Sequence, residues 1–462
     1  MRFKLKRSSK KNFSILIPLS IFLLALVLRL WNFSDIEFKL DQSLAIYKAT
    51  LFWSNKKLPL AGLVSSLNTA NPPLFIYFLL LPVLFSQNPL FITFLFALAG
   101  SFSVLVFYRI LKKYSPILAV FSSLLFSTAA WPIVFSRSIW AQNLLPLFSV
   151  LILFFADRLY FKKKDQAILP LIVLSLWIFQ IHFSGFSVLP FVLIIIFLSR
   201  RRIKIKSFIL GLIIGLLPLV PWFFLQFRDG FIDLIPLFTR RPGNYFDINS
   251  LINPFRIVAG FNFESKLHDD YLEFSKTLPF SRFIWGIFYF QVLLTLAGFF
   301  LSLFKEKKFI LFNLFFISMI ILSFFSRTEA RVFYEEQYFP LIFAYAGVSL
   351  LKIFQVKRFG KIIALSTLTV CLVANLIFII HFFNFVHRKE QISGDYDLVY
   401  WQKERLVQEF LKSKTYPENN LNTAVARVIF SIFNYDKEKK VFYPEKQLVP
   451  FLEPNFKQGN FN

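Results

Sequence analysis

Residues 38–47 read FKLDQSLAIY and contain three polar side chains that could take part in a reaction: Lys39, Asp41 and Gln42. A positioned carboxylate can remove a proton from a hydroxyl, and an ammonium can stabilise charge on a phosphate. The same carboxylate can instead cap the helix that the spacing of SLAIYKATLFW predicts, a role worth about 1 kcal/mol. An ionisable group this close to a long apolar run costs a few kcal/mol unless it is paired or hydrated. Asp41 is therefore a helix cap, a reactive group or both.

Other uncommon polar residues also stand at the ends of apolar runs. They are Asn71 in the first loop, Arg137 in SRSIWAQN, Gln180 and His182 in QIHFSG, and Arg331 and Tyr338 in RTEARVFYEEQYFP. Arg137 and Arg331 are candidate phosphate partners, because guanidinium matches phosphate with two parallel hydrogen bonds. Gln180 and His182 could orient hydroxyls. Each has a structural alternative: Arg137 can reach lipid headgroups, His182 can be a satisfied interfacial residue, and Arg331 can pair with Glu335.

The elements that must position these groups are membrane helices. The chain has 462 residues, of which 56% are hydrophobic and 17% charged, and 66 are Phe. A spanning helix needs about 20 mostly apolar residues, and the apolar runs here have about that length. The sequence predicts an all-α polytopic membrane protein with about eleven spanning helices, over 13–31, 89–110, 115–135, 143–157, 167–182, 184–199, 208–226, 282–304, 309–325, 338–355 and 361–383.

The net charge of +26 is a topology signal. Its basic residues gather in short segments between the apolar runs, such as YRILKKY, RRRIKIK and KRFGK, and Lys and Arg in short loops mark the cytoplasmic side. The N-terminus is predicted to be cytoplasmic and the C-terminus extracytoplasmic, in a cell membrane. This distribution argues against a nucleic-acid partner. The single cysteine, Cys371, lies inside an apolar run, which excludes disulfides and thiolate zinc sites.

Residues 1–383 form the predicted transmembrane domain, and 384–462 form a small extracytoplasmic C-terminal segment. The segment at 72–85 contains three prolines, and counting it as a span would move the next basic loop outside. It is therefore predicted to lie in the outer interface. The tail mixes a helical pattern, YDLVYWQKERLVQEFLKS, with the aliphatic stretch VARVIFSIF, which indicates a small α/β appendage.

A family resemblance enters with the order of these motifs. A first helix ending in LRLW, then LDQ, NPPLFIYFLLLP, SRSIWAQNLLP, QIHFSG and EEQYFPLIFAYAG, resembles the polytopic glycosyltransferases of the GT-C superfamily. The most similar group comprises the protein O-mannosyltransferases, the lipid A aminoarabinose transferases and the dolichyl-phosphate-mannose-protein-mannosyltransferase-like proteins. The resemblance covers residues 13–355.

The resemblance implies an inverting enzyme that moves a hexosyl or pentosyl group from a polyprenyl-phosphate sugar to an extracytoplasmic acceptor, which could be a protein, a lipid or a cell-surface glycan. Asp41 matches the family's catalytic Asp. Gln42 stands where members often have Glu, and Asn71 where His or Lys usually precedes the prolines. The Gln42 departure puts in doubt any role that needs a second negative charge, including metal binding there. Lys39, Gln42, Asn71 and Tyr338 join the expected substrate-binding residues.

Two other classes stay open on the residues. One is a transporter or flippase of lipid-linked sugars, although that class favours inverted repeats and mid-membrane charges. The other is a non-catalytic scaffold of the same fold that uses its tail for binding. A divalent metal is possible at Asp269, Asp270 and Glu273, for which a solvated acidic turn in LHDDYLEF is the alternative.

Overall fold

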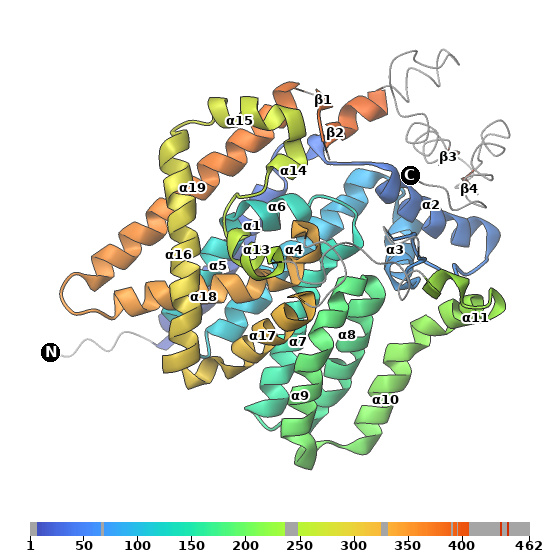
Figure 1. Cartoon of the computed structure of the whole chain (residues 1–462), viewed down its shortest axis with the longest axis horizontal. Helices are drawn as coiled ribbons and strands as arrows, with labels where there is room; N and C mark the ends of the chain where they lie inside the picture. Colours follow the sequence, from blue (N-terminus) through green and yellow to red (C-terminus); the bar gives the residue numbers. More distant parts are fainter. Residues whose placement is uncertain are drawn as a thin grey trace.

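The structure is a computed structural model that describes residues 7–65, 69–235, 248–324, 331–389, 391–394, 396–405, 435–436 and 441–442. The expected helical pattern of the tail is described only through residue 405, and VARVIFSIF lies outside the described residues. What is described is helical, apart from short paired strands. Figure 1 shows the helices gathered into one bundle.

The helices follow the apolar runs of the sequence. In order they are α1 (Arg7–Arg29), α2 (Leu40–Asn55), α3 (Leu74–Phe85), α4 (Pro89–Leu111), α5 (Pro116–Thr128), α6 (Ala130–Phe135), α7 (Leu145–Tyr160), α8 (Ile168–Ile181), α9 (Leu189–Ser199), α10 (Ile205–Leu216), α11 (Val220–Arg228), α13 (Asn249–Arg256), α14 (Glu264–Leu267), α15 (Tyr271–Thr277), α16 (Ser281–Lys305), α17 (Ile310–Phe324), α18 (Phe339–Phe354) and α19 (Gly360–Lys389). The strands β1 (Gln391–Ile392) and β2 (Asp397–Leu398) pair antiparallel, as do β3 (Tyr435–Asp436) and β4 (Val441–Phe442).

Six helical stretches among the described residues are long and apolar enough to cross a membrane: Pro89–Leu111, Ala141–Tyr160, Ile205–Arg228, Ser281–Lys305, Glu336–Phe354 and Gly360–Lys389. Shorter apolar helices coincide with the other predicted spans, over Ile15–Arg29, Pro116–Thr128, Asp165–Ile181, Phe183–Ser199 and Ile310–Phe324. The chain is thus a multi-pass membrane protein. The total of eleven crossings and the orientation of the termini stay predictions.

The segment predicted to lie in the interface forms α3, which has 12 residues. At 1.5 Å per residue it is about 18 Å long, well short of the ~30 Å hydrocarbon core. It packs along α2, and the Trp53 indole N–H donates to the Leu80 carbonyl at 2.9 Å. The placement of this helix in the outer interface stays a prediction.

Two predicted spans differ from the observed helices in shape. The run at 115–135 is broken into α5 and α6 at Ala129, whose backbone is extended (φ −68°, ψ 141°). Pro132 follows three residues later and has no N–H to donate, so the second helix starts afresh at Ala130. The short run at 143–157 gains a 3-10 turn, Ala141–Leu144, and reaches 20 residues as Ala141–Tyr160.

Helix α18 lies at the centre of the bundle, in contact with α5, α16 and α19. Two glycines allow the close packing. A Cβ at Gly298 of α16 would lie 1.8 Å from the Tyr345 carbonyl oxygen, and one at Gly347 of α18 would lie 1.9 Å from the Ser122 hydroxyl. In contrast, α10 and α11 at the edge of the bundle expose large apolar side chains such as Ile213 and Phe224, as a lipid-facing helix does (Figure 1).

A second, smaller hydrophobic core holds the loop that is predicted to be the first exterior one. It joins Ile36 and Phe38 to the inner faces of α2 and α3 and the start of α4. Tyr400 from the C-terminal segment completes it, with its ring edge-on to Phe38 at 5.5 Å. The loop that precedes Asp41 is therefore packed from both sides by segments far apart in sequence.

Helix α19 continues through Lys389, six residues beyond the predicted end of the last span. The β1–β2 pair follows directly, and Ser393 in its turn donates its hydroxyl to the Leu267 carbonyl at 2.8 Å. The β4 strand lies against α2 (Figure 1). The described parts of the C-terminal segment thus pack on the exterior loops.

Candidate active site

Asp41 occupies the second position of α2, in its first turn. The helix begins after Lys39, which holds the N-cap position, so capping is not the role that the structure gives Asp41. Its side chain is exposed, yet the surrounding protein displaces enough water to raise the pKa of the carboxyl above its ordinary value. Lys39 acts to lower this pKa and Glu37 acts to raise it further. A solvent-reachable carboxylate with a raised pKa is suited to accept a proton.

The Gln42 side chain forms hydrogen bonds that hold the same first turn of α2. Its carbonyl oxygen accepts the Lys39 backbone N–H at 2.8 Å, and its amide nitrogen donates to the Ser138 hydroxyl at 3.0 Å. The side chain is fully buried. Both ends of the Gln42 amide are thus occupied by protein, and the residue expected to bind substrate instead fixes the start of α2.

Beside this turn lies an ion pair that is almost fully removed from solvent. Lys266 Nζ lies 2.9 Å from Glu37 Oε2, and the two side chains are 2% and 4% exposed. The Lys266 ammonium also stands over the rings of Phe135 and Trp140, at 5.5 and 5.4 Å. Glu336 is buried close enough to interact with Lys266, and one oxygen of each carboxylate, Glu37 Oε1 and Glu336 Oε1, has no hydrogen-bond partner among the described residues.

The guanidinium of Arg137 binds the backbone just after the end of α1. It donates to the carbonyls of Trp31 and Asn32, the second at 2.8 Å, and it lies over the Phe383 ring at 3.9 Å. It is 1% exposed, and burial lowers the pKa of the guanidinium. The structure therefore places Arg137 as a clamp between α1 and α19, away from solvent.

A path of aromatic contacts links the Asp41 region to His182. From Lys266 it passes over Trp140 to Phe333 at 5.8 Å and on to Tyr334 at 4.4 Å. The Tyr334 ring stacks on the His182 imidazole at 5.4 Å. His182 Nδ1 lies 2.8 Å from the Ser184 hydroxyl.

The remaining predicted site residues divide between surface and interior. Arg331 is exposed at the start of this aromatic stretch, with its guanidinium over Phe333 at 5.9 Å. Gln180 is buried and donates to the Leu176 and Gly215 carbonyls, at 2.8 and 2.7 Å, which ties α8 to α10. Tyr338 is buried, with its hydroxyl 3.0 Å from that of Ser323. Asn71 donates to the Leu63 carbonyl at 2.8 Å and closes the loop before α3.

The C-terminal segment supports the loop that carries Asp41. The Lys403 ammonium is 1% exposed and donates to the Phe38 carbonyl at 2.7 Å. One turn earlier, the Tyr400 backbone N–H donates to the Ile36 carbonyl at 3.3 Å. The backbone carbonyls of Ile36 and Phe38, just before α2, thus accept hydrogen bonds from residues more than 350 positions later in the chain.

Glu37 and Lys266 were not predicted from the sequence. Glu37 stands four residues before Asp41, and Lys266 precedes the acidic turn LHDDYLEF, which drew attention to its carboxylates instead. The only available signal was the presence of one acid and one base in short exterior segments next to apolar runs. Their pairing depends on tertiary packing over 229 positions.

The acidic turn itself is engaged with protein. Lys389 Nζ lies 2.6 Å from Asp270 Oδ1 and also contacts the Glu273 carboxylate. Asp270 further accepts the Ser393 backbone N–H at 2.7 Å. No group of three or more metal-ligating side chains comes together in the described parts of the chain. The carboxylates Asp270 and Glu273 thus join the C-terminal segment to the exterior loops.

Comparison with known proteins finds solved structures that have a similar fold. No protein-family model and no curated protein matches the sequence. Among solved structures, the chain is similar to ArnT from Cupriavidus metallidurans in the apo state, with a TM-score of 0.57 at 12% identity over 98% of this chain and 92% of that one. The same protein bound to undecaprenyl phosphate gives 0.58 at 11% identity over the same shares.

The apo oligosaccharyltransferase of Archaeoglobus fulgidus is also similar, with a TM-score of 0.54 at 11% identity over 94% of this chain and 61% of that one. Both proteins are glycosyltransferases of the GT-C type. The resemblance read from the order of the sequence motifs is therefore confirmed at the level of the fold. The chain has the fold of the GT-C membrane glycosyltransferases.

Proposed function

We propose that this protein is an inverting glycosyltransferase that moves a sugar from a polyprenyl-phosphate carrier to a hydroxyl acceptor at the extracytoplasmic surface. The observation that carries the proposal is Asp41, an exposed carboxyl with a raised pKa on a rigidly held helix start. The fold supports it, since one neighbour of that fold was solved with undecaprenyl phosphate bound.

The chemistry needs one proton acceptor. Asp41 takes the proton from the acceptor hydroxyl while the acceptor oxygen forms a bond to the anomeric carbon. The bond from that carbon to the phosphate oxygen breaks on the opposite face, so the configuration inverts. The electron pair leaves with the lipid phosphate, which is already a good leaving group, and no general acid is required. A positioned base of this kind contributes roughly 10²–10⁴-fold to the rate.

Lys39 and Arg331 are the cations proposed to stabilise the charge that develops on the departing phosphate. Lys39 stands two residues before Asp41 and lowers its pKa, which places its positive charge close to the carboxyl. Arg331 is exposed and can match phosphate with two parallel hydrogen bonds. Arg137 is assigned a structural role, because its guanidinium is buried against the carbonyls of Trp31 and Asn32.

The deciding experiment uses purified protein in liposomes. Labelled undecaprenyl-phosphate hexose and undecaprenyl-phosphate pentose are supplied together with an envelope extract, and transfer of label to the extract is measured for wild type and Asp41→Asn. We expect a loss of roughly 10²–10⁴-fold. Asp269→Asn is the matched control, since it removes an exposed carboxyl from another exterior segment and should keep full activity.

Unchanged transfer by Asp41→Asn would reject the proposed base. Movement of the labelled lipid across the membrane without transfer, in both wild type and variant, would instead identify a transporter of lipid-linked sugars.

A further inference from the structure

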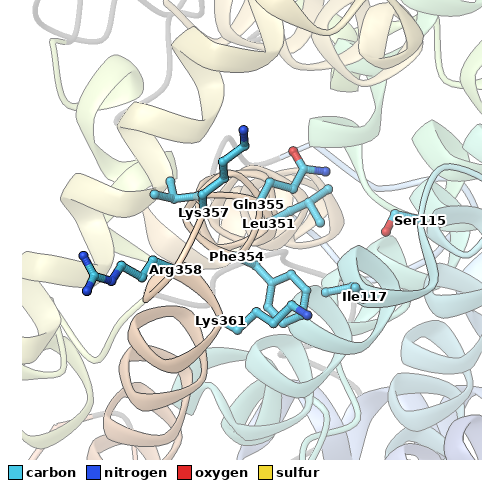
Figure 2. A pocket seen from close by; sticks show the side chains of 9 residues that line it. Ser115, Ile117, Leu351, Phe354, Gln355, Lys357, Arg358 and Lys361 are labelled. Carbon is cyan, nitrogen blue, oxygen red and sulfur yellow. The ribbon is translucent and has the colours of Figure 1, made fainter.

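A hollow lies at the end of the bundle where α18 turns into α19. It has a volume of roughly 430 Å³ and lies between the start of α5, the C-terminal end of α18 and the start of α19. Its lining residues are Ser115, Ile117, Leu351, Phe354, Gln355, Val356, Lys357, Arg358 and Lys361. Figure 2 shows these side chains around the turn. None of them belongs to the site around Asp41.

The hollow combines an apolar wall with a basic rim. Ile117, Leu351 and Phe354 supply the wall, and in Figure 2 the Lys361 side chain extends beside Phe354 and Ile117. The Lys357 and Arg358 side chains point outward from the turn. All three cations are exposed, and none forms an ion pair with a described residue.

Instead of pairing with a described carboxylate, Arg358 and Lys361 lie over the rings of Phe359 and Phe354, at 5.4 and 6.0 Å. Lysines in the surroundings differ from these rim cations. Lys113, beside Ser115, pairs with Asp157 at 2.5 Å, and Lys352 in the last turn of α18 pairs with Glu306. The carboxylates on this end of the bundle are thus used by other lysines. The rim of the hollow keeps about three uncompensated positive charges, which favour an anion.

Two further features favour an anion that belongs to a lipid. The turn exposes Val356 and Phe359, at 60% and 57%, next to its cations. Apolar side chains beside basic ones are typical of the membrane interface. The first turn of α19 also starts at Gly360, where unpaired backbone N–H groups add partial positive charge.

We propose that this hollow binds the phosphodiester headgroup of an anionic phospholipid. Lys357, Arg358 and Lys361 hold the phosphate, and Ile117, Leu351 and Phe354 contact the glycerol and the upper acyl chain. The basic-loop pattern predicts that this end faces the cytoplasmic leaflet, where anionic lipids attract Lys and Arg with about 1 kcal/mol per side chain. The site is independent of the proposed sugar transfer.

The test measures lipid binding by the full chain in detergent. Fluorescent phosphatidylglycerol is titrated into wild type and into the triple variant Lys357→Gln, Arg358→Gln, Lys361→Gln, with fluorescent phosphatidylcholine in parallel. The expected result is a loss of at least about tenfold in affinity for phosphatidylglycerol, with phosphatidylcholine unaffected. The double variant Lys357→Arg, Lys361→Arg keeps the charges and should bind like wild type.

A matched control separates a site from general basicity. Arg200→Gln, Arg201→Gln and Lys206→Gln together remove the same charge from another exposed basic loop, and this variant should keep wild-type affinity. Equal losses in the two triple variants would overturn the proposal. Full competition by millimolar inorganic phosphate would also overturn it, because it would show a site for free phosphate and no contribution from the apolar wall. Thermal unfolding of each variant establishes that it is folded.

Discussion

Replacing Lys266 by Met tests whether the ion pair beneath Asp41 holds the exterior loops together. Lys266 and Glu37 are 2% and 4% exposed and 2.9 Å apart, so the substitution leaves the Glu37 carboxylate buried without its partner. Removing one member of a buried pair costs about 3–5 kcal/mol. Lys266 also lies over the Phe135 and Trp140 rings, contacts worth roughly 0.5–2 kcal/mol together when desolvated.

The double variant Glu37→Met, Lys266→Met separates charge from packing. Replacing both members of a buried pair by apolar side chains of similar length is often neutral. We therefore expect the double variant to recover most of the stability that Lys266→Met loses. Lys276→Met removes an exposed lysine from α15 and should change the free energy of unfolding by less than about 0.5 kcal/mol.

The assay is thermal unfolding of purified protein in detergent, followed by tryptophan fluorescence, with all variants at one protein and detergent concentration. The expected order of stability is wild type, Lys276→Met and the double variant close together, with Lys266→Met well below. If Lys266→Met were as stable as Lys276→Met, or if the double variant were no better than Lys266→Met, the assignment of this pair as a structural tie would be wrong.

Three further predictions concern the start of α2. Because burial raises the pKa of Asp41, the pH at which kcat/KM falls on the acid side should lie above the ordinary aspartate pKa of about 3.9. Glu37→Gln removes a negative charge that raises this pKa, so this acid limb should move to lower pH when kcat/KM is measured against pH. Gln42→Leu removes the hydrogen bonds to Lys39 and Ser138 and should lower stability by about 1–3 kcal/mol in thermal unfolding, whereas Gln42→Glu, which keeps the acceptor for the Lys39 N–H, should lose less. Lys403→Met leaves the Phe38 carbonyl without its charged donor and should lower kcat with KM and the acid limb unchanged in steady-state kinetics, because Lys403 positions the loop and lies outside the reacting groups.

The helices were predictable because each follows from a local property of the sequence. Runs of about 20 apolar residues, proline at the first helical position and polar caps such as Asn88 mark most of the bundle. The side on which the next basic loop is expected to lie predicts that α3 lies in the interface. The break at Ala129 was missed because a helix on either side of a bend has the same composition as a continuous one.

The candidate site was predicted only in its most local part. Asp41 and Lys39 are two residues apart in sequence, and in the structure the charge of Lys39 is close enough to lower the pKa of Asp41. Arg137 and Gln180 are polar residues at helix ends, as are the residues that bind ligands, and only tertiary contacts show that they bind backbone carbonyls. Lys266 and Lys403 could not be found this way, because their partners lie 229 and 365 positions away.

The geometry explains why a polar loop this heavily anchored presents an exposed carboxyl. A base must meet an acceptor that arrives from water, so Asp41 cannot be buried, and an exposed side chain on a loose loop would spend little time in the productive position. Gln42 fixes the helix start, Lys403 fixes the loop before it, and the Glu37–Lys266 pair fixes that loop to α14. An anchored backbone with an accessible carboxyl is the arrangement that preorganised proton transfer requires.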